Sequence, residues 1–167
     1  MEISTEMIKE LREKSGAGVM ECRNVLMGCQ GDMDKALKVL KEKGLLKAQK
    51  KAERATTQGL VAAYIHTGGR IGAMVEVNCE TDFVARTDEF QEMAHCLAMQ
   101  VAAMNPQFIS AEEIPDGADV DPQTACLLCQ PYIKDPTLTV QDLIAGTIAR
   151  VGENIRVRRF ARFELGN

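Results

Sequence analysis

The spacing of hydrophobic residues changes near residue 55, from the period of a helix to the two-residue period of a β-strand. Before this point, apolar residues recur every three or four positions, as in Val19, Cys22 and Val25. After it, the runs GLVAAYI and IGAMVEVN flank the sequence HTGGR, whose two glycines supply the positive φ that a hairpin turn needs. We therefore expect an N-terminal helical domain with its linker over residues 1–54 and an α+β domain over residues 55–167.

Three short helices are predicted in the first 44 residues, because each has a start or stop signal. Ser4 or Thr5 caps the first helix, which stops at the sequence SGAG, and the second breaks off at the GCQG segment. Asp32 caps the third helix, which ends at Gly44. The basic segment LLKAQKKAERA then predicts a helical linker whose charges form either a solvated face or a binding patch.

The second domain is predicted to contain a small antiparallel sheet packed against helices. Thr87 is a suitable N-cap for a long helix, and the pair Thr139 and Asp142 predicts a capping box for another. The C-terminal sequence NIRVRRFARFEL alternates apolar and charged residues as a strand does, apart from a predicted bulge at Arg159 and Phe160.

Composition and charge exclude several classes of protein. The chain has 167 residues, of which 46% are hydrophobic and 26% charged, as in folded, soluble proteins. Its 24 acidic and 20 basic side chains leave a net charge of -4, without the strong basic excess of a nucleic-acid binder. We find no apolar run long enough to span a membrane and no signal peptide, so we expect a cytoplasmic protein whose partner is another protein.

Enzymatic activity is not expected. The sequence has two histidines and three serines, with no G-x-S-x-G motif around any serine and no phosphate-binding G-x-x-x-x-G-K-[ST] motif. We therefore predict no catalytic residues and no cofactor.

The six cysteines leave two interpretations open. Cys126-x-x-Cys129 has the spacing of half a zinc ribbon or of a redox motif, but the other four cysteines contain no second pair. The favoured interpretation is that the cysteines are small buried hydrophobic residues and that the chain holds no metal. The alternative is a metal or redox site at this pair.

The segment CETDFVART also admits two interpretations. It places Asp82 beside Phe83 in a predicted loop between a buried strand and a helix. In the first, Phe83 folds back under the hairpin while Asp82 caps the following turn. In the second, Phe83 projects into solvent as an aromatic wedge that anchors a protein interface.

Four segments resemble one family in order and spacing: LREKSGAGVMECRNVL, VNCETDFVAR, QPYIKDPTLTV and NIRVRRFARFELG. The chain is similar to elongation factor Ts, the exchange factor for the GTPase elongation factor Tu. The resemblance implies a three-helix domain like a ubiquitin-associated domain, which docks on the GTPase through a region that includes Val19 and Met20. It also implies that the motif at Thr81, Asp82, Phe83 and Val84 reaches the nucleotide site and helps to dislodge Mg²⁺ from the GDP complex.

A guanine-nucleotide exchange factor that performs no covalent chemistry is therefore the leading functional hypothesis. The resemblance implies binding to both the GDP-bound and the nucleotide-free GTPase. Short relatives with one core subdomain form homodimers, which implies a symmetric interface here, either around Cys126 to Cys129 or on the terminal strand. The alternative function is that of an adaptor whose three-helix domain recognises another protein.

Overall fold

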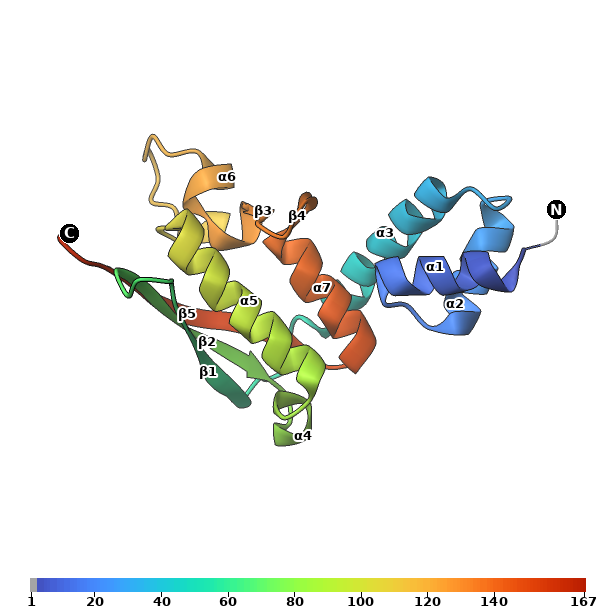
Figure 1. Ribbon diagram of the computed structural model, residues 1–167, viewed down its shortest axis with the longest axis horizontal. Helices are drawn as coiled ribbons and strands as arrows, with labels where there is room; N and C mark the ends of the chain where they lie inside the picture. The colour runs from blue at the N-terminus through green and yellow to red at the C-terminus, as the bar shows by residue number, and fades with distance from the viewer. Residues whose placement is uncertain (1–2) are drawn as a thin grey trace.

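Two separate hydrophobic clusters organise the chain, one in an N-terminal helical unit and one in a larger α+β unit. A computed structural model describes residues 3–167, so the first two residues of the predicted N-terminal domain lie outside the described residues. The helical unit projects from one end of the molecule and joins the larger unit through its third helix (Figure 1). The predicted α+β class is confirmed, whereas the exact domain boundary at residues 54 and 55 stays a prediction.

Local signals in the sequence set the ends of the N-terminal helices. The Ser4 hydroxyl accepts a hydrogen bond from the backbone N–H of Met7 at 3.2 Å, and Gly16 ends the first helix at φ 66°. Asp32 caps the third helix through the N–H of Lys35 at 3.0 Å. The three helices are α1 (Thr5–Ser15), α2 (Val19–Gly28) and α3 (Met33–Lys51).

The prediction that α3 ends at Gly44 is wrong, because the helix continues without a break to Lys51. Gly44 is buried and faces α7 (Val140–Val151), where a Cβ atom would lie 4.0 Å from the carbonyl oxygen of Ala145. The glycine therefore allows two helix backbones to approach closely, and the first part of the predicted linker belongs to α3.

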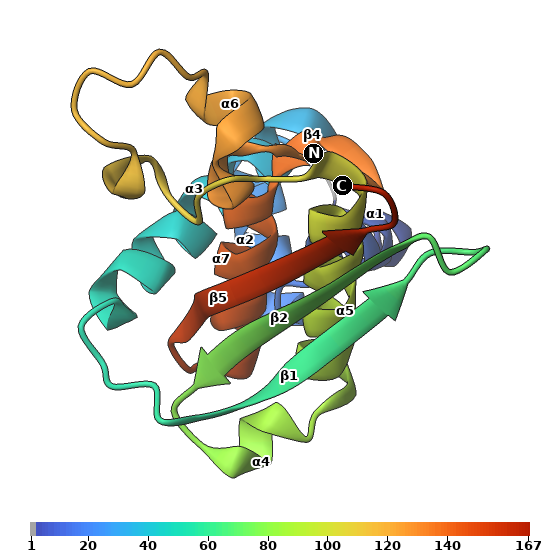
Figure 2. The same cartoon turned by 90° about the vertical axis from the view of Figure 1, so that its left-hand side faces the viewer.

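The α+β unit is built on a three-stranded antiparallel sheet with strand order β1-β2-β5. The predicted hairpin is confirmed: Gly68 and Gly69 have φ values of 92° and 68° in the turn between β1 and β2. Helices cover one face of the sheet, and no helix of residues 3–167 covers the opposite face (Figure 2). The strands are β1 (Gln58–Ile65), β2 (Ile71–Cys79) and β5 (Ile155–Glu164).

The inner face of the sheet packs against α5 (Asp88–Met104) and α7, which together enclose the larger core. Thr87 caps α5 through the N–H of Phe90, and Thr139 forms the predicted capping box of α7 with Asp142. Residues that share this core and are at most 4% exposed include Val75 and Val77 of β2, Phe90 and Leu97 of α5, and Val140 and Ile148 of α7.

The bulge in β5 lies one residue earlier than predicted. Arg159 pairs with Glu76 and Val157 pairs with Val77, so Arg158 is the additional residue. A single extra residue reverses the alternation that follows it. For this reason Phe163 is exposed on the outer face, whereas Arg162 lies toward α5 and donates a hydrogen bond to the carbonyl of Ala102 at 3.0 Å.

A small two-stranded ribbon of β3 (Pro131–Tyr132) and β4 (Asp135–Thr139) was not predicted from the sequence. Buried Gln100 anchors it to α5, since its amide nitrogen donates to the carbonyl of Pro131 and its oxygen accepts from the N–H of Ile133. Before the ribbon, the chain forms a 3-10 turn (Ala111–Glu113), α6 (Pro122–Ala125) and a second 3-10 turn (Leu127–Cys129).

Candidate partner-binding site

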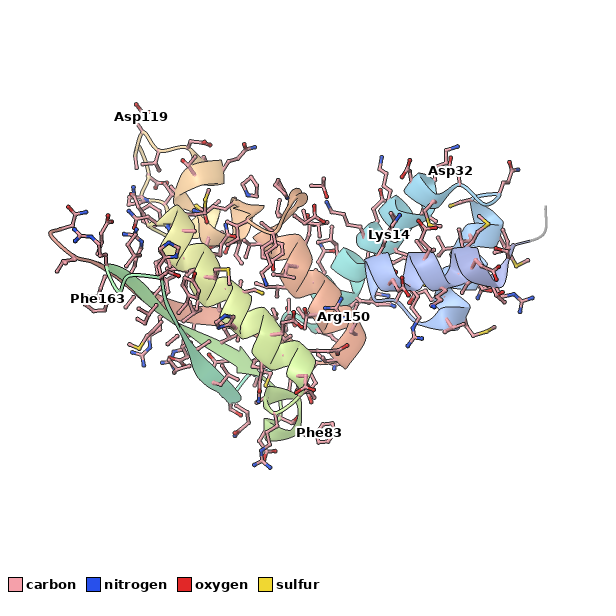
Figure 3. The ribbon with its side chains drawn as sticks, viewed as in Figure 1. Lys14, Asp32, Phe83, Asp119, Arg150 and Phe163 are labelled. Carbon is pink, nitrogen blue, oxygen red and sulfur yellow. The ribbon has the colours of Figure 1, made fainter. Side chains whose placement is uncertain are left out.

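The motif at residues 81–84 lies at one end of the sheet, where it forms the short helix α4 (Asp82–Ala85). Thr81 caps this helix, with its hydroxyl 3.4 Å from the N–H of Val84. Val84 is 4% exposed and belongs to the larger core, whereas Phe83 is 77% exposed. In Figure 3, Phe83 points away from the body of the molecule. The motif therefore combines an apolar anchor with a projecting aromatic ring.

The interpretation in which Phe83 folds under the hairpin is wrong, because no part of the core covers its ring. Asp82 is not the capping residue either: its carboxylate pairs with Arg86 at 2.9 Å on the surface of the helix. Thr81 takes the capping role, and Val84 supplies the burial that Phe83 was expected to supply. The projecting-ring interpretation agrees with this geometry.

A contact from a distant part of the chain was missed by the sequence interpretation. The carboxylate of Glu153, in the turn between α7 and β5, accepts hydrogen bonds from Glu80 and Thr81. Glu153 belongs to no motif that spacing or residue type would single out, so only the folded arrangement identifies it.

The predicted contact residues of the N-terminal unit lie together at the start of α2. Gly18 precedes the helix in an extended conformation, and Val19 and Met20 follow it with 49% and 61% of their surface exposed. Two neighbouring apolar side chains at a helix start are candidates for an interface, because the core buries neither of them. Their role in binding stays a prediction.

A cleft of about 1010 Å³ is lined by residues of the N-terminal unit and by residues of α7 and β4. Val19 lines it on one side, and the remainder of the lining mixes apolar, glycine and charged residues from both units. Among the lining residues, the ammonium group of Lys41 lies 2.8 Å from the carboxylate of Asp142, whose side chain is only 9% exposed. Burial raises the pKa of Asp142, but hydrogen bonds from Lys41 and Thr139 outweigh this and hold the pKa below its ordinary value.

A second cross-unit contact lies at the turn after α1. The side chain of Arg150 fills the space beside Gly16, where a Cβ atom would lie 2.6 Å from the guanidinium nitrogen Nη1. The same guanidinium lies 3.8 Å from the Glu89 carboxylate at the start of α5. Figure 3 shows Arg150 at the junction of the two units.

Some of the basic side chains in the predicted linker form ion pairs within the molecule. Lys47 donates to both carboxylate oxygens of Glu21 at 2.9 Å, and Arg54 lies 3.6 Å from Glu80. Lys50 is exposed. These ion pairs connect the segment to α2 and to the end of β2. Lys47 and Arg54 are therefore not part of a basic patch that is free to bind a partner.

The two cysteines of the C-x-x-C pair flank the second 3-10 turn, with Cys126 just before it and Cys129 at its end. Cys126 is fully buried, and burial is the main cause that raises the pKa of its thiol, which favours the protonated form. Among residues 3–167, no group of three or more histidine, cysteine, aspartate or glutamate side chains is placed to hold a metal ion. In the same part of the chain, no helix is both long and apolar enough to cross a membrane.

Comparison with known proteins identifies the class. The family described as Elongation factor TS matches residues 4–119. Elongation factor Ts of Thermoanaerobacter sp. (strain X514) is 48% identical over 98% of this chain and 95% of the relative. The corresponding proteins of Carboxydothermus hydrogenoformans and Desulfosudis oleivorans are 46% and 44% identical over 98% of this chain, covering 89% and 98% of their own lengths.

These similarities define a factor of translation elongation. Within that class, the chain belongs to the elongation factor Ts family, which confirms the resemblance seen in the sequence. The alignments run over 194 positions although the chain has 167 residues, so the relatives contain internal residues that have no counterpart here.

Proposed function

We propose that the protein is a guanine-nucleotide exchange factor for elongation factor Tu and performs no covalent chemistry. It binds the GDP complex, displaces Mg²⁺, promotes GDP release and holds the nucleotide-free GTPase until GTP binds. The observation that carries the proposal is the exposed ring of Phe83 on a short helix anchored by Val84.

The physical basis of exchange is the linkage between two binding equilibria. Mg²⁺ bridges the phosphate oxygens of GDP and side chains of the GTPase, so its displacement removes much of the attraction that holds the nucleotide. A factor that binds the nucleotide-free state more tightly than the GDP state weakens GDP binding by the same free energy. The projecting ring of Phe83 is the group that enters the partner and disturbs this metal site.

One aromatic residue does not account for the whole effect. A 10⁴-fold faster release corresponds to a barrier lower by about 5.5 kcal/mol, whereas one buried aromatic hot spot contributes about 2–4 kcal/mol. A second contact must supply the remainder. Val19 and Met20 at the start of α2 are the proposed second contact, because both are exposed and Val19 lines the cleft beside the larger unit.

The test is the release of fluorescent GDP from elongation factor Tu in the presence of catalytic amounts of this protein. The proposal requires a release rate that rises with the concentration of the factor and saturates. If the rate equals the spontaneous rate at every concentration, the exchange function is rejected and the adaptor interpretation is favoured.

We also propose that two copies associate through the outer face of the sheet. Of the two surfaces expected from the sequence, the segment around Cys126 and Leu127 is buried within its own core. The terminal strand instead presents Phe163, at 70% exposure, in register with Gly72 and beside the exposed Met74 of the central strand.

Charge on this outer face suits a second copy related by a two-fold axis. The face carries Glu76, which pairs with Arg159 at 2.7 Å and Arg158 at 3.5 Å, so acidic and basic groups lie next to the apolar patch. In a dimer with a two-fold axis, the same face of both copies forms the interface. The acidic and basic groups of one copy then face those of the other, and opposite charges can pair. Light scattering of the purified protein tests this association, and a monomeric mass at all concentrations would contradict it.

A further inference from the structure

We propose that Glu153 is a positioning residue for nucleotide exchange, whose carboxylate fixes the turn that presents Phe83 to the partner. One carboxylate oxygen accepts hydrogen bonds from the backbone N–H groups of Glu80 at 3.1 Å and Thr81 at 3.0 Å. The other accepts from the Thr81 hydroxyl at 2.6 Å. All three donors belong to the two residues that precede α4. This inference rests on the proposed exchange function.

The carboxylate of Glu153 has no other use in the described part of the chain. It forms no ion pair within 4 Å among residues 3–167, so its two oxygens serve the turn before Phe83. Hydrogen bonds to a charged acceptor are stronger than those between neutral groups. The contact therefore restrains the backbone of Thr81, two residues before the projecting ring.

A reciprocal contact holds the other side of the same turn. The carboxylate of Glu80 accepts from the N–H of Asn154 at 2.7 Å, so Glu80 and Glu153 each reach across to the other's segment. Asn154 is 2% exposed, and its side-chain amide donates to the carbonyls of Ala52 at 3.3 Å and Arg54 at 2.9 Å. The turn before Phe83 is thus tied both to the loop between α7 and β5 and to the segment that follows α3.

This arrangement has a functional reason beyond stability. Phe83 has few contacts with its own fold, so the direction of its ring depends on the position of the short helix that carries it. Val84 fixes this helix from the core side, and Glu153 fixes its N-terminal end. A ring that is already held in one direction loses less conformational entropy on binding a partner than a ring on a mobile loop.

The experiment compares Glu153→Ala and Glu153→Gln in the GDP-release assay. We expect Glu153→Ala to lower the maximal release rate about tenfold while the half-saturating concentration changes less than about twofold, because positioning acts on the transition state. Glu153→Gln keeps a carbonyl oxygen for the two backbone donors and an amide for the Thr81 hydroxyl, so we expect it to retain the rate within about threefold.

The matched control is Glu113→Ala. Glu113 also accepts a loop N–H, that of Ile109 at 2.9 Å, but it lies in a different loop of the molecule. This variant should leave both parameters unchanged. Amide hydrogen exchange should show faster exchange at Thr81 in Glu153→Ala and near-normal protection in Glu153→Gln, which tests the anchoring without any partner.

A double variant shows whether Glu153 acts through the ring. In a Phe83→Ala background, Glu153→Ala should cause no further loss of rate, because there is no ring left to position. A full additional loss in this background, or a wild-type rate for Glu153→Ala alone, would overturn the proposal. Wild-type protein without exchange activity would instead reject the exchange function, and the amide exchange rates would still report whether Glu153 holds the turn.

Discussion

Truncation of Phe83 to alanine should separate exchange activity from folding. The ring is 77% exposed, so its removal deletes few contacts within the protein. We expect the free energy of unfolding to change by less than about 0.5 kcal/mol, as for other surface substitutions. With about three quarters of its surface in solvent, the Phe83 side chain contributes few contacts to the stability of the fold.

The expected effect on exchange is much larger. A buried aromatic hot spot in a complex is worth about 2–4 kcal/mol. If this free energy is expressed in the transition state for GDP release, the rate constant falls by about 30- to 900-fold at 1.36 kcal/mol per factor of ten. The remaining rate then reflects the docking of the N-terminal unit and of other core contacts.

The assay measures the release of fluorescent GDP from elongation factor Tu at increasing concentrations of each variant, alongside thermal unfolding of the free factor. Phe90→Ala is the matched control, because Phe90 is fully buried in the larger core. It should reduce the free energy of unfolding by about 3–5 kcal/mol. A Phe83→Ala variant with the wild-type release rate, or with a loss of stability comparable to that of Phe90→Ala, would refute the reasoning.

Three further predictions address docking, pH and association. Met20→Lys should raise the half-saturating concentration about tenfold without changing the melting temperature, since the side chain is exposed; an unchanged half-saturation would exclude Met20 from the interface. The pKa of Asp142 is lower in the folded state than in the unfolded state. Its carboxylate therefore stabilises the fold at pH values above the unfolded-state pKa, and this stabilisation is lost as the pH falls through the folded-state pKa. Urea unfolding should therefore show Asp142→Asn less stable than wild type by about 1–2 kcal/mol at pH 7. This difference should shrink as the pH falls below the ordinary range of an aspartate pKa, and a difference that does not change with pH would contradict the role of the carboxylate. Phe163→Asp should yield monomers in light scattering with an unchanged helical circular dichroism spectrum, and a dimeric mass would place the association elsewhere.

Features set by neighbouring residues could be predicted from the sequence. Asp32, Thr87 and the pair Thr139 and Asp142 cap the helices as predicted, because a cap involves only a few adjacent residues. The hairpin at Gly68 was predictable for the same reason. The projecting ring could be stated only as one of two interpretations, because exposure depends on what the rest of the fold covers.

Features set by distant residues could not be predicted. Gly44 carries the usual signal of a helix end, but contact with Ala145 makes it a point of close approach between α3 and α7. The bulge at Arg158 depends on the pairing of β5 with β2, and its one extra residue reverses the face on which Phe163 lies. The contact between Glu153 and Thr81 joins positions 72 residues apart, which no local pattern encodes.

The same long-range contacts explain how two small apolar surfaces could act together on one partner. If Phe83 and the start of α2 bind at the same time, their combined free energy depends on how rigidly the two are held relative to one another. Two sets of contacts connect the N-terminal unit to the larger unit. The first is the ion pair of Lys41 with Asp142. In the second, the side-chain amide of Asn154 donates to the carbonyls of Ala52 and Arg54 after α3, while the backbone N–H of Asn154 donates to Glu80. The hydrogen bond between Asn154 and Glu80 therefore links two regions: the turn before Phe83 and the segment that leads from the N-terminal unit.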